Sequence, residues 1–111
     1  YGCCEDLTEK IDILRQVPNL RRIAVSPFAD VAKCAEQIGT DYVISYRPSP
    51  ADTVSYDFNP DRSIRKILRR DFEAMKGTHF DVTLKDVETV EGHPDRVRKW
   101  VQIVRAEIER L

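Results

Sequence analysis

Residues 20–46, LRRIAVSPFADVAKCAEQIGTDYVISY, hold the clearest secondary-structure pattern in the chain. After two arginines, residues 20–26 become a nearly continuous apolar run, which is typical of a strand covered on both faces. Beyond Pro27, apolar residues recur at the spacing of one buried helical stripe as far as Gly39, and glycine commonly ends a helix. Residues 42–46 are apolar again, so we predict a strand, a helix and a second, parallel strand.

The same alternation of strand and helix extends toward the N-terminus. The run Gly2-Cys3-Cys4 predicts the end of a further strand. Asp6 and Glu9 have the spacing of a capping box, which predicts that a helix begins at Asp6. The first residue is Tyr1 and not methionine, so we expect the chain to begin at an internal point of a longer protein.

Toward the C-terminus, residues 47–60 are rich in proline and short polar residues and predict a long irregular connection. Asn59-Pro60 then predicts a helix start, because asparagine caps helices and proline fits the first helical position. Gly77 predicts the end of that helix, residues 80–84 predict a fourth strand, and a last helix begins at Pro94. Helical spacing predicts that Cys34 and Trp100 belong to the hydrophobic core.

Together these patterns predict an α/β fold of four consecutive βα units with a sequential parallel sheet, in one domain over residues 1–111. We expect the helices to cover one face and apolar side chains to line the other. A free-standing flavodoxin-like domain of four strands is the alternative arrangement, but no phosphate-binding glycine loop is present.

Net charge, apolar runs and cysteine count indicate which partners and which cellular compartment the protein has. The formal net charge of the 111 residues is -1, which predicts neither a nucleic acid nor a membrane surface as partner. No apolar run approaches the ~20 residues of a membrane-spanning helix, and the N-terminus has no signal-peptide pattern. Three cysteines are an odd number for a disulfide framework. We therefore expect a cytoplasmic protein with reduced thiols.

In parallel α/β folds, ligands bind the loops that follow the carboxyl ends of the strands. Those loops contain the candidate site residues Cys3, Cys4, Ser26, Arg47, Lys85, Asp86 and Glu88. The guanidinium of Arg47 is permanently charged and can donate two parallel hydrogen bonds to a carboxylate or a phosphate of a ligand. The alternative is that Arg47 forms a salt bridge with an acidic residue of a neighbouring loop. Lys85, Asp86 and Glu88 are candidate catalytic residues, with an ion-pair network that orders the loop as the alternative.

A metal site is not predicted. Side chains alternate along a strand, so at most one of the adjacent thiols of Cys3 and Cys4 faces the site, and zinc needs three or four ligands. His79 precedes the fourth strand and lies at its opposite end, ~17 Å away for a strand of about five residues. His93 either approaches the site as a substrate-binding residue or lies in an exposed turn before Pro94.

The segments GCCE, LRRIAVSPFADV and LKDVETV resemble the C-terminal half of the uroporphyrinogen decarboxylase-like superfamily, which also contains cobalamin-dependent methyltransferases. The resemblance covers essentially all 111 residues. It implies that the chain is the C-terminal half of a TIM (β/α)8 barrel. It also implies an enzyme that acts without a cofactor on a carboxylate side chain of a tetrapyrrole.

Two other functions fit the same resemblance. One is corrinoid-dependent methyl transfer to a thiol, in which family members hold zinc through a His-x-Cys pair, where this chain has Tyr1-Gly2-Cys3. The other is a non-catalytic half-barrel. In each case we expect the fragment alone to be inactive and to pair with the missing N-terminal half of the barrel or with a second copy as a homodimer, closing the sheet.

Overall fold

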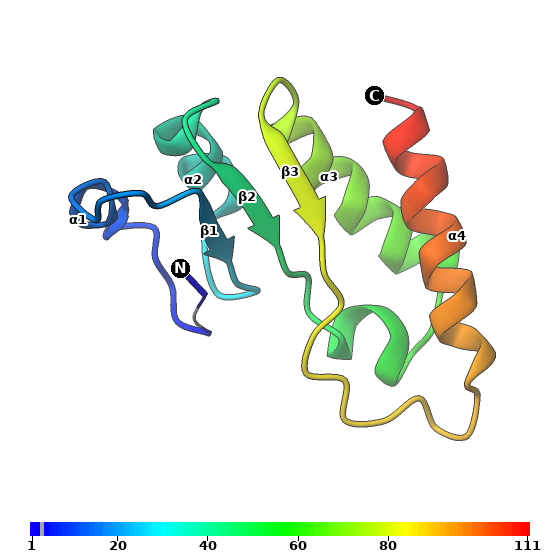
Figure 1. Ribbon diagram of the computed structural model, residues 1–111. Helices are drawn as coiled ribbons and strands as arrows, with labels where there is room; N and C mark the ends of the chain where they lie inside the picture. Colours follow the sequence, from blue (N-terminus) through cyan, green and yellow to red (C-terminus); the bar gives the residue numbers. More distant parts are fainter. Residues whose placement is uncertain (3) are drawn as a thin grey trace. The chain divides into compact units, whose positions relative to one another are not determined.

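The computed structural model of the protein describes residues 1–2 and 4–111 (Figure 1). Along the chain lie α1 (Ile11–Leu14), β1 (Arg22–Val25), α2 (Val31–Ile38), β2 (Val43–Tyr46), the π-helices η1 (Ala51–Ser55) and η2 (Pro60–Ile64), α3 (Arg65–Met75), β3 (His79–Val82) and α4 (Asp95–Glu109). The chain divides into two compact units. The first comprises residues 1–47 and 74–83 and holds the sheet, and the second comprises residues 48–73 and 84–111.

The sheet of the first unit is parallel, and its strands follow the order β1-β2-β3. Ile23 is paired with Ile44, and Ile44 with Phe80. The predicted parallel pairing and sequential order are thus confirmed for these strands.

The predicted fold class, four consecutive βα units forming the C-terminal half of a TIM barrel, is wrong. Within the described residues the sheet has three strands. At the expected first strand, the amino group of Tyr1 donates to the carbonyl of Arg22 at 2.7 Å, and Ala24 N–H donates to the carbonyl of Tyr1 at 2.9 Å. Cys3 lies outside the described residues. Tyr1 is thus hydrogen-bonded to β1 but is not part of a strand, because a strand needs a ladder of several residues.

The two faces of the sheet differ in polarity. Because side chains alternate along a strand, one face carries Ile23, Val25, Ile44 and Tyr46, and each of these is at most 2% exposed. In Figure 1 helix α2 lies behind β1 and β2. The other face carries the side chains of Arg22, Ala24, Val43, Ser45, His79 and Asp81. The expectation of a second apolar face is therefore wrong.

The helix α2 follows the sequence prediction closely. The Asp30 carboxylate accepts a hydrogen bond from Lys33 N–H at 3.0 Å and so caps its N-terminus. Gly39 ends the helix with φ of +56°, a conformation that glycine adopts at little cost. Cys34 is fully buried, as predicted. By contrast, the carboxylate of Asp6 accepts from Thr8 N–H at 2.9 Å in a local turn, and α1 begins later, at Ile11.

In the second unit, the connection predicted to be irregular contains the π-helix η1. The Pro50 carbonyl accepts hydrogen bonds from the backbone N–H groups of Val54 and Ser55 at 3.0 and 2.9 Å. Pro50 is tolerated because it occupies the N-cap, where its missing N–H leaves no helical hydrogen bond unmade. The prediction for residues 47–60 is wrong at this point. The predicted helix start at Asn59-Pro60 is confirmed, because Asn59 caps η2 by accepting from Arg62 N–H at 2.9 Å.

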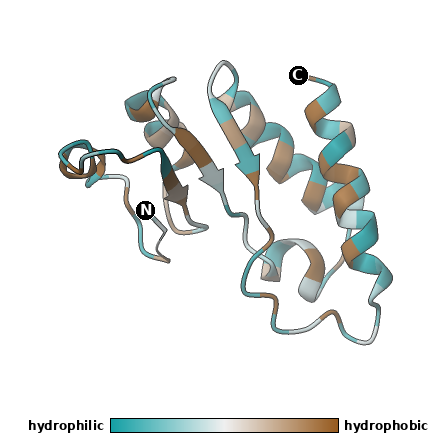
Figure 2. Cartoon of the chain, in the orientation of Figure 1, coloured by the Kyte–Doolittle hydropathy of each residue, from teal (hydrophilic) through white to brown (hydrophobic). Residues whose placement is uncertain are grey.

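Helix α4 is amphipathic, with alternating hydrophobic and hydrophilic residues along its length (Figure 2). Trp100 is 3% exposed, which confirms its predicted place in the core. Val97 and Val101, which also belong to α4, are 42% and 41% exposed. Across the described parts of the chain, we found no helix with the length and apolar character needed to cross a membrane.

The buried carboxylate of Glu107 in α4 forms ion pairs with three arginines. Its oxygens accept from Arg69 at 3.0 Å, Arg110 at 2.9 Å and Arg65 at 3.5 Å. Burial by itself raises the pKa of Glu107, but the hydrogen bonds from Arg69 and Arg110 and their charges outweigh it and hold that pKa below its usual value. The ionised form of Glu107 therefore stabilises the fold.

We expect this stabilisation to be complete above the unfolded-state pKa of Glu107, near its ordinary value, and to be lost as pH falls through the lower folded-state pKa. Urea unfolding between about pH 6 and pH 3 measures the loss. Glu107→Gln should be less stable than the original chain at pH 6 and should lose less stability on acidification. Parallel stability profiles for the two proteins would contradict this assignment.

Candidate functional site

In the first unit, Ser26 and Arg47 directly follow the carboxyl ends of the adjacent strands β1 and β2. The Arg47 N–H donates to the carbonyl of Val25 at 3.0 Å and extends the ladder between the strands by one residue. The backbone therefore fixes Arg47 beside the end of β1. In parallel α/β sheets, ligands bind at this edge.

The Arg47 side chain is half-buried and lies against Gly2. Its Nε donates to the hydroxyl of Ser45 at 3.4 Å, a long hydrogen bond. Its Nη2 lies 3.2 Å from the point where a Cβ on Gly2 would stand, so a larger residue at position 2 would press on the guanidinium. Among residues 1–2 and 4–111, no carboxylate lies within ion-pair distance of Arg47. The alternative prediction, a salt bridge between Arg47 and an acidic residue, is therefore not supported within the described residues.

Ser26 has a structural task at the same edge. Its hydroxyl donates to the carbonyl of Glu5 at 3.0 Å and accepts from Phe28 N–H at 3.3 Å, and the residue is 2% exposed. These bonds tie the segment near Glu5 to the loop after β1. The Phe28 ring, in that loop, is 74% exposed. An exposed aromatic ring at a ligand-binding edge offers a stacking surface.

The polar face of the sheet carries an ion pair that the sequence did not reveal. Arg22 Nη2 in β1 donates to Asp81 Oδ2 in β3 at 2.5 Å. The other oxygen, Asp81 Oδ1, is buried and has no hydrogen-bond partner in the part of the chain described by the structure. The polar residue Asp81 within a strand was a visible signal, but its partner lies 59 positions away and depends on strand register.

The cysteines separate into exposed and buried positions. Cys4 is exposed at the start of the first unit, and the candidate Cys3 lies outside the described residues. Burial raises the pKa of the Cys34 thiol, whose sulfur lies 3.7 Å from Thr8 Oγ1. Cys34 is thus held as a neutral core residue. Within the described ranges, no three His, Cys, Asp or Glu side chains gather as metal ligands.

The remaining candidates belong to the second unit. Lys85 Nζ lies 3.7 Å from Asp86 Oδ2, so these two form an ion pair, and Asp86 adopts a positive φ of 60°. Glu88 and His93 are exposed. The structure therefore brings Lys85 and Asp86 together, and in the other unit it places Ser26 and Arg47 at one sheet edge.

No family model, curated protein or solved structure matches this chain. The resemblance to the uroporphyrinogen decarboxylase-like superfamily accordingly stays a prediction from the sequence.

Proposed function

We propose that this chain is part of an enzyme that binds a carboxylate side chain of a tetrapyrrole, with Arg47 as the carboxylate ligand. The observation that carries the proposal is the half-buried Arg47 guanidinium, which has no anionic partner among the described residues at the carboxyl end of β2. A guanidinium forms two parallel hydrogen bonds with a carboxylate, and burial strengthens them. Arg47 is therefore suited to anchor an acidic ligand.

Phe28 supports a flat, aromatic ligand at the same edge. Its ring is 74% exposed in the loop after β1, the strand next to β2. Aromatic rings stack on flat conjugated surfaces, and a tetrapyrrole presents a large one. A charged anchor and an aromatic platform on neighbouring loops are a combination that binds acidic macrocycles.

The catalytic step is proposed from the sequence resemblance. Decarboxylation breaks the bond between the side-chain carbon and its carboxylate, CO2 leaves, and the electron pair remaining on carbon takes a proton. Lys85, Asp86 and Glu88, which belong to the second unit, stay the catalytic candidates of the sequence prediction. Pairing with a second copy or with a further part of the enzyme also stays a prediction.

We expect Arg47→Ala to weaken binding of coproporphyrin, a tetrapyrrole with four carboxylates, by about 10- to 100-fold, because one charge-assisted contact contributes about 1.5–3 kcal/mol. Quenching of porphyrin fluorescence measures the dissociation constant. Coproporphyrin methyl ester, which lacks carboxylates, should bind the original chain about as weakly as coproporphyrin binds the variant.

Arg21→Ala is the matched control, because Arg21 is an exposed arginine of the same unit that precedes β1, at the opposite end of the sheet. It removes the same charge and should leave porphyrin affinity within about twofold, since exposed charges contribute little. Equal affinity of Arg47→Ala and the original chain would exclude the proposed anchor. Equal weakening by Arg21→Ala would show that only overall charge matters.

A further inference from the structure

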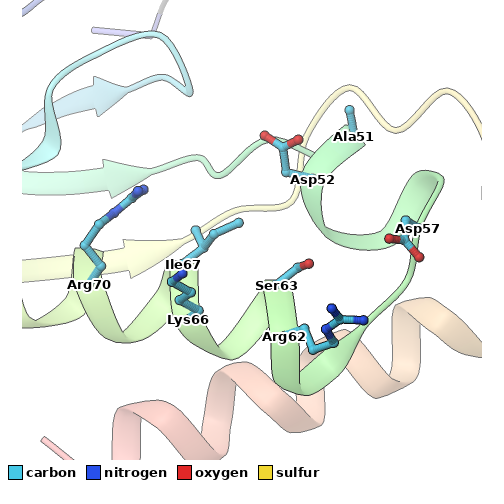
Figure 3. A pocket seen from close by; sticks show the side chains of 8 residues that line it. All are labelled: Ala51, Asp52, Asp57, Arg62, Ser63, Lys66, Ile67 and Arg70. Carbon is cyan, nitrogen blue, oxygen red and sulfur yellow. The ribbon is translucent and has the colours of Figure 1, made fainter.

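The second unit contains a cavity of about 590 Å3, and none of its lining residues is one that the sequence singled out as functional (Figure 3). Its polar lining consists of Asp52, Asp57, Arg62, Ser63, Lys66 and Arg70. The volume lies within the range of small-molecule sites, roughly 300–1,000 Å3. Three basic and two acidic side chains give the lining a formal charge of +1.

The basic residues follow one side of the continuous helical segment formed by η2 and α3. Arg62, Lys66 and Arg70 are spaced four residues apart, which places them on one helical face with a rise of about 6 Å from each to the next. Ser63 lies within the same row in Figure 3, while Asp52 in η1 and Asp57 just after it lie across the cavity. Cationic donors therefore stand on one side and carboxylate acceptors on the other.

Four of these charges are not used within the fold. Arg70 forms an ion pair with Asp71, at 2.9 Å. In the described portion of the chain, Arg62, Lys66, Asp52 and Asp57 have no ion-pair partner. The neighbouring Arg65 and Arg69, which point elsewhere, bind Glu107. Four of the five charged side chains that line the cavity thus form no ion pair within the described residues.

We propose that this cavity binds a small phosphorylated polyol. Arg62 and Lys66 hold the phosphate, because a phosphate monoester is close to a dianion at neutral pH and matches two adjacent cations. The hydroxyl of Ser63 is a further donor to its oxygens. Asp52 and Asp57 only accept hydrogen bonds when ionised, so they bind the polyol hydroxyls and disfavour ligands that are anionic throughout.

This site is separate from the proposed function, because Arg47 belongs to the other unit. The probes are ribose 5-phosphate, inorganic phosphate and ribose, with affinities measured by NMR titration of backbone amides. We expect ribose 5-phosphate to bind at least tenfold more tightly than inorganic phosphate, and ribose to bind more weakly than both. Shifted amides should belong to residues 51–70.

Two variants separate the two sides of the cavity. Arg62→Gln with Lys66→Gln removes the cations while keeping long side chains, and should weaken both ribose 5-phosphate and phosphate at least tenfold. Asp52→Asn with Asp57→Asn should weaken ribose 5-phosphate and leave inorganic phosphate unchanged or bound more tightly, because two repelling charges are lost.

Arg98→Gln with Arg105→Gln is the matched control, since both are exposed arginines of α4 in the same unit. It removes the same total charge and should leave both affinities within twofold. The proposal is overturned if the control weakens binding as much as the cavity variant does. It is equally overturned if ribose 5-phosphate binds no more tightly than inorganic phosphate, or if the shifted amides lie outside the cavity.

Discussion

Replacing Ile44 with alanine should lower the free energy of unfolding by about 2–5 kcal/mol. Ile44 lies in the central strand β2, is fully buried, and is paired with Ile23 and Phe80 on the apolar face. Alanine would lose the transfer free energy of the removed methyl and methylene groups and leave a cavity, because a packed core relaxes only in part. Urea unfolding followed by far-ultraviolet circular dichroism measures the change.

Val43→Ala is the control, because Val43 is the preceding residue of β2 and its side chain lies on the opposite, polar face, where it is partly exposed. Val43→Ala should lower the free energy of unfolding by less than about 1 kcal/mol, since less apolar surface is buried on the polar face. The comparison tests which face of the sheet forms the core. Similar losses for the two variants would contradict the assignment of the faces.

Glu107→Ala should be the most damaging charge substitution in the second unit, with a loss of about 2 kcal/mol at neutral pH. Breaking a buried ion pair costs about 3–5 kcal/mol, and we take less because water screens Arg65, Arg69 and Arg110, whose side chains are 31%, 53% and 56% exposed. The Glu107 side chain itself is 3% exposed. Its removal leaves three guanidiniums without their shared carboxylate.

The fluorescence of Trp100, the single tryptophan, reports this unfolding from the same helix as Glu107. Glu109→Ala provides the comparison, since Glu109 is exposed two residues further along α4. Its effect should stay within about 0.5 kcal/mol, as is usual for surface substitutions. If Glu107→Ala is no less stable than Glu109→Ala, the arginine cluster contributes nothing measurable to the stability of this unit.

Local sequence patterns were enough to predict the helices and strands whose boundaries are set by a few neighbouring residues. The apolar run before Pro27, the stop at Gly39 and the start at Asn59-Pro60 all match the structure. Cys34 and Trp100 were also predicted to be buried, because helical spacing places them on the face that packs inward. In each case the deciding physics is short-range: a fixed dihedral angle, a cap or one helical period.

The errors occurred where distant residues complete the structure. In η1, a single nitrogen of Arg96, Nη1, donates to the carbonyls of Val54 and Ser55 at 3.1 and 3.2 Å, about 40 residues away in sequence. Sequence rules treat the prolines of residues 47–60 only as breakers, so this π-helix was missed. The predicted N-terminal strand near Gly2 is absent from the described residues for a related reason. An apolar stub becomes a strand only if a ladder of backbone hydrogen bonds forms along it.

The sequence by itself determined that the strands are parallel and sequential and that Arg47 follows a strand end, because apolar periodicity and connection length carry that information. Tertiary structure alone decided which distant charged side chains lie close together. Strand register brings Arg22 and Asp81 together as an ion pair. It also places Arg47 beside Gly2, with no carboxylate partner in the described part of the chain. Helix packing likewise engaged Arg65 and Arg69 with Glu107 while Arg62 and Lys66 line a cavity. Charges separated by tens of residues become partners only when the fold brings them within a few ångströms, where their interaction is strong enough to matter.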